Sequence, residues 1–219
     1  MVNSDYKITL PKHIIALVVL VVVLVLGFTI RYDSDYFFYL LWNIFLAFIP
    51  FLISSKLLWY KNKEKKYPVI FVLGLTLWLV VFPNAPYVVT DLIHLIASTF
   101  VPLWINVILL FSSAWIGIFL GIISLFHIEQ IILPWFGRIK TDLIILGVIL
   151  LSSFGVYLGR FLRWNSWDIF LQPKAILNDF IDIFSNPLSH KEAYITTIVF
   201  FVLITVSYNI WKSVFKETR

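Results

Sequence analysis

The chain has no cysteine among its 219 residues, and it has little charge. Without cysteine there is no disulfide framework, cysteine-bound zinc, iron–sulfur cluster or thiol nucleophile. Charged residues make up 13% of the chain, whereas hydrophobic residues make up 61% and the mean hydropathy is +0.94. Since a soluble domain is roughly 45–50% apolar, this composition excludes a soluble globular enzyme and predicts a protein that lies in a lipid bilayer.

Common catalytic and cofactor patterns are missing as well. The chain contains no Gly-x-Ser-x-Gly, His-Glu-x-x-His, Walker or dinucleotide-binding sequence, so ATP-driven and nicotinamide-dependent chemistry are not supported. A bis-histidine haem needs two histidines that face each other within the membrane, but His94 and His127 lie at opposite ends of about the same predicted span, and His13 and His190 lie near loop or terminal ends. No cofactor is therefore expected.

Long apolar runs are what the sequence has in abundance. A helix needs about 20 apolar residues to cross the hydrocarbon core of a bilayer, and six runs bounded by charge or proline approach or exceed this length. They predict an all-α polytopic membrane protein with one membrane-embedded domain over residues 1–219. The six predicted transmembrane helices cover about 14–30, 36–55, 69–82, 101–126, 143–158 and 193–211. Pro50 predicts a kink in the second of them.

The distribution of positive charge predicts the orientation. Six spans place both termini on one side of the membrane. Of the 17 lysines and arginines, 12 fall on that side and 5 on the other, and positively charged loops stay in the cytoplasm. We therefore expect a multi-pass protein of the cell membrane with both termini cytoplasmic. The net charge of +5 is explained by these loops, so no nucleic-acid partner is expected.

Two connections between the predicted spans carry structure of their own. Residues 83–100 contain no lysine or arginine, and Pro83 and Pro86 break the helix there. This pattern predicts a broken or re-entrant segment between helices 3 and 4, sheltered by protein or lining a watery cavity. Residues 174–185 carry apolar side chains at helical spacing and predict an interfacial amphipathic helix between helices 5 and 6. A helix that covers the bundle fits the same pattern.

Polar residues gather in two segments, which is informative because polar groups are costly in a membrane. The first segment, residues 82–95, contains Asn84, Asp91 and His94. The second segment, residues 159–168, contains Arg160, Arg163, Asn165, Ser166 and Asp168. By the charge count both segments face the extracytoplasmic side. Their charges are complementary, so we expect them to meet in space and to form one polar site.

Two strings within these segments are distinctive: PNAPYVVTDLIHL at residues 83–95 and YLGRFLRWNSWD at residues 157–168. Together with Leu41, Trp42, Asn43 and Pro50 they resemble a bacterial integral-membrane family catalogued as domain of unknown function 1361. The resemblance covers most of the chain and implies a multi-span bacterial membrane protein. It implies no activity, cofactor or partner for any residue, so function has to be argued from the chemistry of the residues.

Asp91 and His94 are the candidate catalytic residues, and three roles fit them. They suit a general base with its orienting carboxylate, or two ligands of a divalent cation with Asp168 as the third. Asp91 also suits a salt bridge to Arg160 or Arg163 that pins the two segments together. The salt bridge is the favoured single role. An Asp-x-x-His pair is too common to predict a metal, and no metal site is expected.

Five residues are candidates for binding substrate. They are Arg160, Arg163, Asn165, Asp168 and Asn84. Two guanidiniums on one helical face suit a phosphate or carboxylate group, whereas the alternative makes both arginines interface anchors beside an aromatic belt of Trp164 and Trp167. The polar residues that follow add hydrogen-bonding capacity that an anchor does not need. Asn84, between two prolines, either satisfies broken backbone or contacts a ligand.

Three further polar residues are interpreted as structural. Asn43, within the second predicted span, is expected to hydrogen-bond between helices. His127 and Glu129 fall at the cytoplasmic end of the fourth predicted span, opposite the two polar segments, and are expected to be interface residues. They are not expected to join the extracytoplasmic site.

Three classes of function remain open. The first is a membrane enzyme that acts at the outer leaflet on an anionic or lipid-linked substrate, with the arginines holding charge and Asp91 or His94 moving a proton. The second is a non-catalytic subunit of the cell envelope that docks another membrane protein. The third is a small transporter, which is the least favoured because charges deep within the spans mark an ion path and here they gather at one rim.

Overall fold

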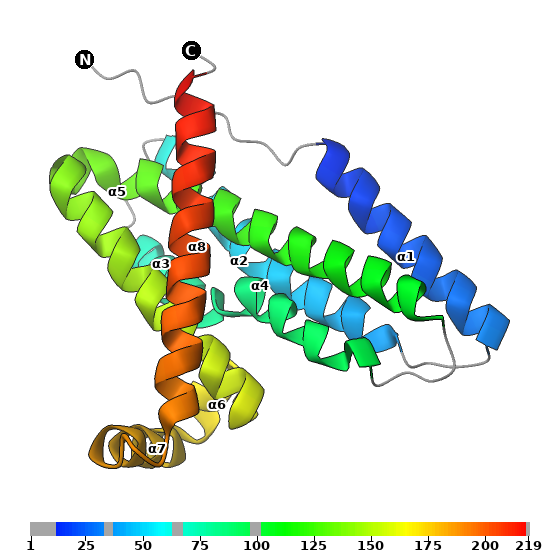
Figure 1. Cartoon of the computed structure of the whole chain (residues 1–219). Coiled ribbons are helices and arrows are strands. Elements are labelled where there is room, and N and C mark those ends of the chain that lie inside the picture. Colours follow the sequence, from blue (N-terminus) through cyan, green and yellow to red (C-terminus); the bar gives the residue numbers. More distant parts are fainter. Residues whose placement is uncertain (1–11, 33–36, 63–67, 97–101, 218–219) are drawn as a thin grey trace.

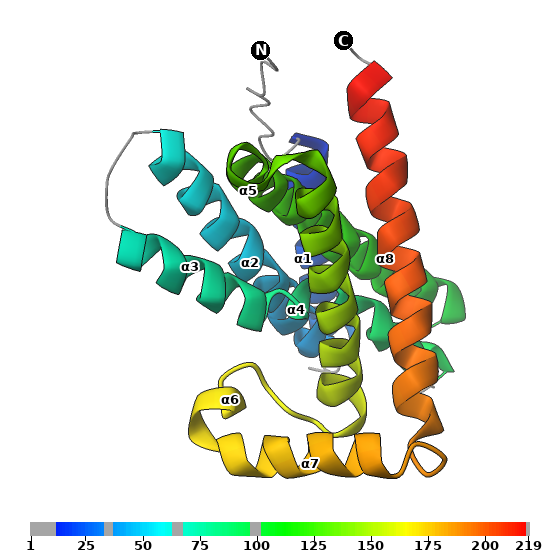
Figure 2. The ribbon, with the colours of Figure 1, turned by 90° about the vertical axis from the view of Figure 1, so that its left-hand side faces the viewer.

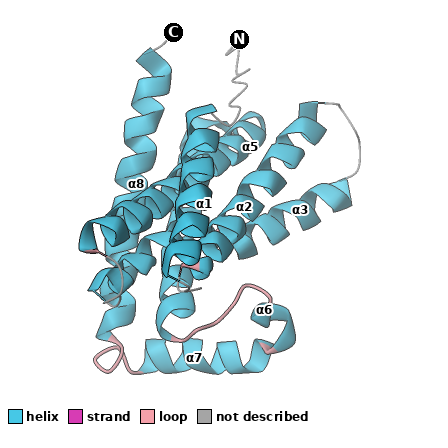
Figure 3. Ribbon diagram, turned by 90° about the vertical axis from the view of Figure 1, so that its right-hand side faces the viewer, coloured by secondary structure: helices cyan, strands magenta, loops and turns pink. Residues whose placement is uncertain are grey.

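The computed structural model describes residues 12–32, 37–62, 68–96 and 102–217, and over these ranges the chain is helical and contains no strand (Figures 1 and 3). The elements in chain order are α1 (Lys12–Tyr32), α2 (Phe38–Asn62), α3 (Pro68–Val81), α4 (Asn84–Tyr87), the 3₁₀ helix η1 (Val88–Ile96), α5 (Leu103–Phe161), α6 (Asp168–Leu171), α7 (Pro173–Ser185) and α8 (Lys191–Glu217). The all-α prediction is confirmed.

Five helical segments of the described chain are long and apolar enough to cross a membrane. They are Lys12–Arg31, Phe38–Lys61, Val69–Leu95, Leu103–Phe161 and Lys191–Val214. Many of their large apolar side chains point outward, as on α3, where Val69, Val72 and Leu73 are all exposed. Exposed apolar surface of this extent suits lipid rather than water, so the architecture is that of a membrane-embedded protein. Tyr36 and Val101, which begin two predicted spans, lie outside the described residues.

Helix α5 contains both the fourth and the fifth predicted spans and is broken between them. Gly137 has φ 70° and ψ 175°, which is not a helical conformation and which glycine adopts without steric cost. Pro134 lies three residues earlier, and its missing N–H leaves the carbonyl of Gln130 without its usual helical donor. The Nζ of Lys61, on α2, donates to that carbonyl at 2.6 Å. A glycine, a proline and a lysine on another helix thus allow α5 to change direction (Figure 1).

Helix α3 ends at Val81, before Pro83, and the chain continues through α4 and η1 as short helical turns. The amides of Ala85 and Tyr87 bond the carbonyls of Phe82 and Pro83 at 3.1 and 3.0 Å. The segment packs closely on both halves of α5. A Cβ at Gly117 would lie 2.5 Å from the Ala85 carbonyl oxygen, and one at Gly155 would lie 2.7 Å from the Pro83 ring. The break is therefore sheltered by protein, as non-helical backbone in a membrane must be.

The core lies on both sides of α5. One apolar cluster joins α5 to α1, α2 and α4, and another joins α5 to α3 and α8. Trp78 of α3 links them through a polar contact, because its Nε1 donates to Oγ of Ser124 at 2.7 Å and that hydroxyl donates to the carbonyl of Pro50 at 3.1 Å. Helix α5 therefore sets the position of almost every other element.

Helices α6 and α7 cross the bundle at the end opposite the C-terminal end of α8 (Figures 1 and 2). Helix α7 covers the predicted residues 174–185 and packs on the bundle along one edge. Its Ile183 is buried, and its Phe180 ring lies 4.9 Å from the Phe154 ring of α5. The opposite edge exposes Leu177 and Ile181. The helix thus covers part of the bundle and also presents an apolar face outward.

Candidate functional site

Three of the sequence-predicted residues meet at the end of the molecule near α7. We call Asn43, Asp91, His94 and Arg160 the Asp91 cluster. Asp91 is 1% exposed, and its carboxylate accepts a hydrogen bond from Nδ2 of Asn43 at 2.7 Å. The other carboxylate oxygen lies 3.7 Å from Nη1 of Arg160, and Nη2 of Arg160 lies 3.0 Å from Nε2 of His94. The segments around Asp91 and Arg160 therefore touch, through the salt bridge that their charges favour.

The local helix type explains why Asp91 and His94 both contact Arg160. Both lie on η1, and in a 3₁₀ helix residues three apart are eclipsed on one face. An arginine only donates hydrogen bonds, so Nε2 of His94 must accept from it and the ring proton lies on Nδ1. The ring of Tyr39 packs edge-on against His94 at 5.4 Å. Asn43, which is half-buried, bonds Asp91 across helices, as expected for an amide in a membrane helix.

Arg163 does not join the cluster. Helix α5 ends at Phe161, and Arg163 lies beyond it in a left-handed conformation with φ 60°. Its side chain is exposed and has no hydrogen bond or ion pair with any residue that the structure describes. The expectation that Arg160 and Arg163 share one helical face is therefore wrong, because the helix stops between them.

The remaining predicted residues shape the loop after α5. Asp168 is buried at the start of α6, and its Oδ2 accepts from the backbone amide of Asn165 at 2.7 Å and from the side-chain amide of Asn165 at 3.1 Å. Asp168 thus fixes the loop and is not bonded to Asp91 or His94. Within the described ranges no three His, Cys, Asp or Glu residues are close enough to hold a metal ion. Asn84 does link the two segments, since its Nδ2 donates to Oγ of Ser166 at 3.3 Å.

A pocket of about 440 Å³ lies beside the Asp91 cluster, between α2, the α3–α4 junction, the second half of α5, and α6 and α7. Asn43 belongs to both, because it bonds Asp91 and also lines the pocket. The polar lining comes from Asn43, Asn84, Asn165, Ser166 and Tyr87, and the indole rings come from Trp42, Trp164 and Trp167. The apolar lining comes from Leu46, Leu79, Leu151, Phe154, Ile176 and Phe180, among others.

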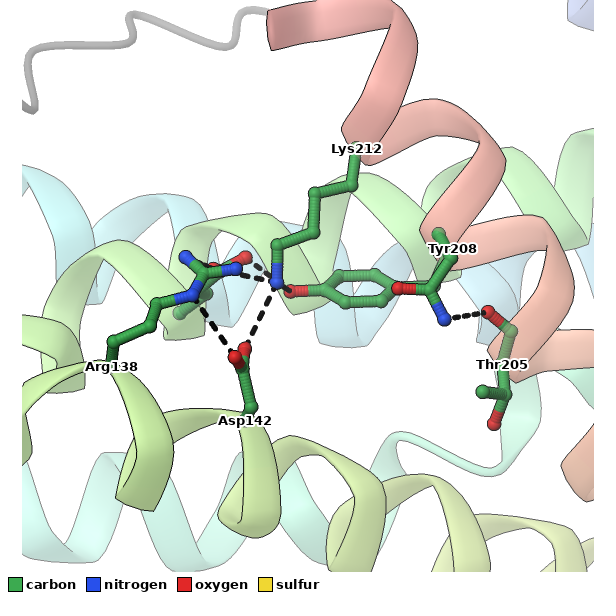
Figure 4. A network of polar contacts seen from close by, with 7 residues as sticks. Arg138, Asp142, Thr205, Tyr208 and Lys212 are labelled. Atoms are coloured by element: carbon green, nitrogen blue, oxygen red, sulfur yellow. Dashed lines mark hydrogen bonds and ion pairs between the residues drawn. The ribbon is translucent and has the colours of Figure 1, made fainter.

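Sequence reasoning missed a second polar cluster, at the opposite end of the molecule. We call it the Glu129 network: Glu129, Arg138, Asp142, Tyr208 and Lys212. Glu129 is buried, and its Oε1 lies 2.7 Å from Nη1 of Arg138 and 3.0 Å from Nζ of Lys212. Its other oxygen accepts a hydrogen bond from the hydroxyl of Tyr208. Asp142 lies 3.0 Å from both cations, which converge in front of the Tyr208 hydroxyl (Figure 4).

Glu129 and its neighbour His127 are therefore not the interface residues that the sequence suggests. His127 is 2% exposed, and its Nδ1 lies 3.1 Å from Oγ of Ser54 on α2. Ser54 lies 73 positions from His127 in the chain and Tyr208 lies 79 positions from Glu129, although Arg138 lies only 9 positions from Glu129. The signal available in the sequence was the presence of an acidic residue and two basic residues at the ends of three predicted spans.

Comparison with known protein families places most of the chain in one family. Residues 42–206 match the model of a family described as "Protein of unknown function (DUF1361)", which covers most of the chain and includes Asn43, the whole of the segment around Asp91 and the whole of the segment around Arg160. No curated protein and no solved structure matches the chain.

Proposed function

Because the chain belongs to the DUF1361 family, whose function is unknown, we propose a function from the geometry alone: it is an integral membrane protein of the cell envelope that binds an amphiphilic molecule from the outer leaflet. The single observation that carries this proposal is the pocket beside the Asp91 cluster. One part of its lining is amide, hydroxyl and indole, and another part is apolar. A pocket of mixed lining suits a molecule with a polar head and an apolar tail.

The proposed topology has six spans with both termini in the cytoplasm, and the two halves of α5 cross separately. The break at Gly137 and the change of direction of α5 support this count. In this arrangement α7 lies in the extracytoplasmic interface with Leu177 and Ile181 toward lipid. The Glu129 network, with Arg138 and Lys212, then lies toward the cytoplasm, where positive charge is expected.

Catalysis is the second candidate function. The observation that favours it is the carboxylate of Asp91, which contacts Asn43 of the pocket lining, with the guanidinium of Arg160 and then the imidazole of His94 behind it. None of Asp91, His94 and Arg160 lines the pocket itself. Because a general base must come within hydrogen-bond reach of its substrate, we place binding before catalysis. If the protein is an enzyme, the wild type should convert its bound lipid to a product of different mass, and Asp91→Asn should bind the lipid without converting it.

Transport is disfavoured by the core between the two polar ends. Asn43 and Ser54 lie on the same helix, α2, about 16 Å apart along its axis. The side chains of Ile44, Ala47 and Phe51 between them are buried in an apolar cluster. Helix α2 therefore carries no polar side chain between Asn43 and Ser54, where an ion or proton path along this helix would require one.

The test of the binding proposal compares two neighbouring leucines on α5. Leu151 lines the pocket and is 59% exposed, whereas Leu150 is 48% exposed and does not line it. Leu151→Trp should place an indole in the pocket and obstruct it, and Leu150→Trp is the matched control. Native mass spectrometry of the purified proteins should show a retained lipid on the wild type and on the Leu150 variant, and not on the Leu151 variant. Equal retention by all three proteins would contradict the proposal.

A further inference from the structure

The pocket has no charged side chain in its lining. Of the described residues that line it, none is lysine, arginine, aspartate or glutamate. Arg160, the cation closest to Asn43 in the contact network, is already held by Asp91 and His94. Arg163 is exposed outside the pocket. An anionic headgroup would therefore lose its water without gaining a counter-charge, which is unfavourable.

The amide oxygens of the pocket offer hydrogen-bond acceptors to a ligand. A carboxylate only accepts hydrogen bonds, so Asn43 must turn its NH₂ toward Asp91 and its carbonyl oxygen away. Asn84 likewise donates a hydrogen bond from one side-chain N–H to Oγ of Ser166. The indole N–H of Trp164 donates to Asp179 at 2.7 Å, so it too is engaged within the protein. The amide oxygens of the lining are left as acceptors for a ligand, and the hydroxyls of Tyr87 and Ser166 and the indole N–H groups of Trp42 and Trp167 can donate to one. A ligand that both donates and accepts hydrogen bonds therefore suits the pocket.

The aromatic side chains of the pocket indicate which chemical class of ligand fits it. Trp42, Trp164, Trp167 and Tyr87 all line the pocket. A sugar ring presents apolar C–H faces that pack on such rings, while its hydroxyls project from the edge and can donate. A quaternary ammonium group also packs on aromatic rings, but in a phospholipid it is joined to a phosphate, for which the pocket has no cation.

From these three observations we propose that the pocket binds a lipid whose headgroup is an uncharged polyol, such as a sugar. The hydroxyls donate to the carbonyl oxygens of Asn43 and Asn84, the ring lies against the indoles, and the acyl chain lies along Leu46, Leu79 and Leu151. The volume of about 440 Å³ falls in the range of about 300–1,000 Å³ that is usual for ligand pockets. The inference rests on the proposed function and adds the chemistry of the headgroup.

The experiment is a competition among three lipids with identical acyl chains. The protein is purified in an alkyl polyoxyethylene ether, because a maltoside detergent carries the proposed headgroup. An equimolar mixture of monoglucosyl diacylglycerol, phosphatidylcholine and phosphatidylglycerol is added, and native mass spectrometry measures the three adducts. The glucolipid adduct should exceed both phospholipid adducts. Asn84→Leu should lower its ratio to phosphatidylcholine about fivefold, the usual effect of one neutral hydrogen bond.

The control and the outcomes separate this inference from the proposed function. Asn209→Leu makes the same change at an exposed asparagine outside the pocket and should keep the wild-type ratio. If Asn84→Leu does not fold, Trp42→Leu, on the exposed side of α2, replaces it and should lower the ratio in the same direction. Preference for either phospholipid, or no preference, overturns the polyol headgroup. Adducts that survive Leu151→Trp overturn the pocket as a binding site, and the inference with it.

Discussion

The two polar clusters of the molecule differ in how they balance charge. In the Asp91 cluster one carboxylate faces one guanidinium, and the other partners, Asn43 and His94, are neutral. In the Glu129 network two carboxylates face two cations. Each cluster adjoins a pocket: the first lies beside the mixed pocket of about 440 Å³, which has no charged side chain in its described lining, whereas the second lines a pocket of about 370 Å³ with the charged side chains of Arg138, Asp142 and Lys212, which tie the two halves of the α5 turn to α8. The comparison suggests that the first end serves a ligand and the second end fixes the bundle.

The largest expected effect concerns the side of the membrane on which each cluster lies. The chain has no cysteine, so a single introduced cysteine reports one position. Lys140→Cys, close to the Glu129 network in sequence, should be shielded from an impermeant thiol reagent in intact cells and labelled after permeabilisation. Ser189→Cys, just after α7, should be labelled in intact cells. Labelling of Lys140→Cys from outside would reverse the orientation. The loop positions Lys63 and Ser98, equally suited by sequence, lie outside the described residues.

The next effect concerns the free energy of unfolding. Removing a carboxylate should cost more in the Asp91 cluster, which has one ion pair, than in the Glu129 network, which has several. Asp91→Ala leaves Arg160, whose side chain is 16% exposed, without a partner of opposite charge. Breaking a buried pair in this way costs about 3–5 kcal/mol, and we expect a large fall in the melting temperature of the purified protein. Asp142→Ala, at a side chain 42% exposed, should cost no more than about 1 kcal/mol.

A double variant tests whether the pairing itself is responsible. Asp91→Ala combined with Arg160→Ala should lose less stability than the sum of the two single variants, because neither charge is then left alone. Additive losses would show that the two side chains stabilise the fold independently.

The same comparison explains what sequence could predict. The meeting of Asp91, His94 and Arg160 can be predicted because these residues lie in two short, distinctive strings and because η1 keeps Asp91 and His94 on one face. The place of Asn43 beside them cannot, since it lies outside both strings. The six apolar runs were equally visible, although two of them are joined in α5 through a glycine that tolerates a positive φ. The Glu129 network cannot be predicted from the sequence, since Glu129 and Tyr208 lie 79 positions apart and each charged residue alone is typical of the end of a span. Arg163 was misplaced because nothing local to it indicates where α5 ends.

A smaller effect is expected at the turn of α5, which positions Arg138 for the Glu129 network. Pro134 has no N–H to donate to the carbonyl of Gln130. The Nζ of Lys61 donates to that carbonyl instead. Lys61→Met should leave that carbonyl without this donor and cost about 1–3 kcal/mol, read as a fall in melting temperature. Adding Pro134→Ala restores a backbone N–H and should recover part of the loss. Failure of the double variant to recover would assign the effect of Lys61 to its other contacts.

The smallest effect concerns pH at the end of α7, next to the pocket. Asn186 and His190 donate hydrogen bonds to Asp182 at 2.7 and 2.9 Å, and these bonds hold the pKa of Asp182 below its ordinary value of 3.8. A carboxyl group with a lowered pKa stabilises the folded state above the ordinary value, and the contribution is lost as pH falls through the folded value. Hydrogen exchange of the backbone amides of residues 183–190, corrected for the intrinsic rate, should therefore lose protection below about pH 4.

Asp182→Ala should lack this protection at every pH, whereas Asn178→Ala, on the exposed side of the same helix, should keep the wild-type profile. Because Asp182 is exposed and α7 is also held by buried Ile183, we expect the loss to stay local and the pocket beside Phe180 to keep its shape. A fall in lipid binding over the same pH range would show instead that the pocket depends on this turn.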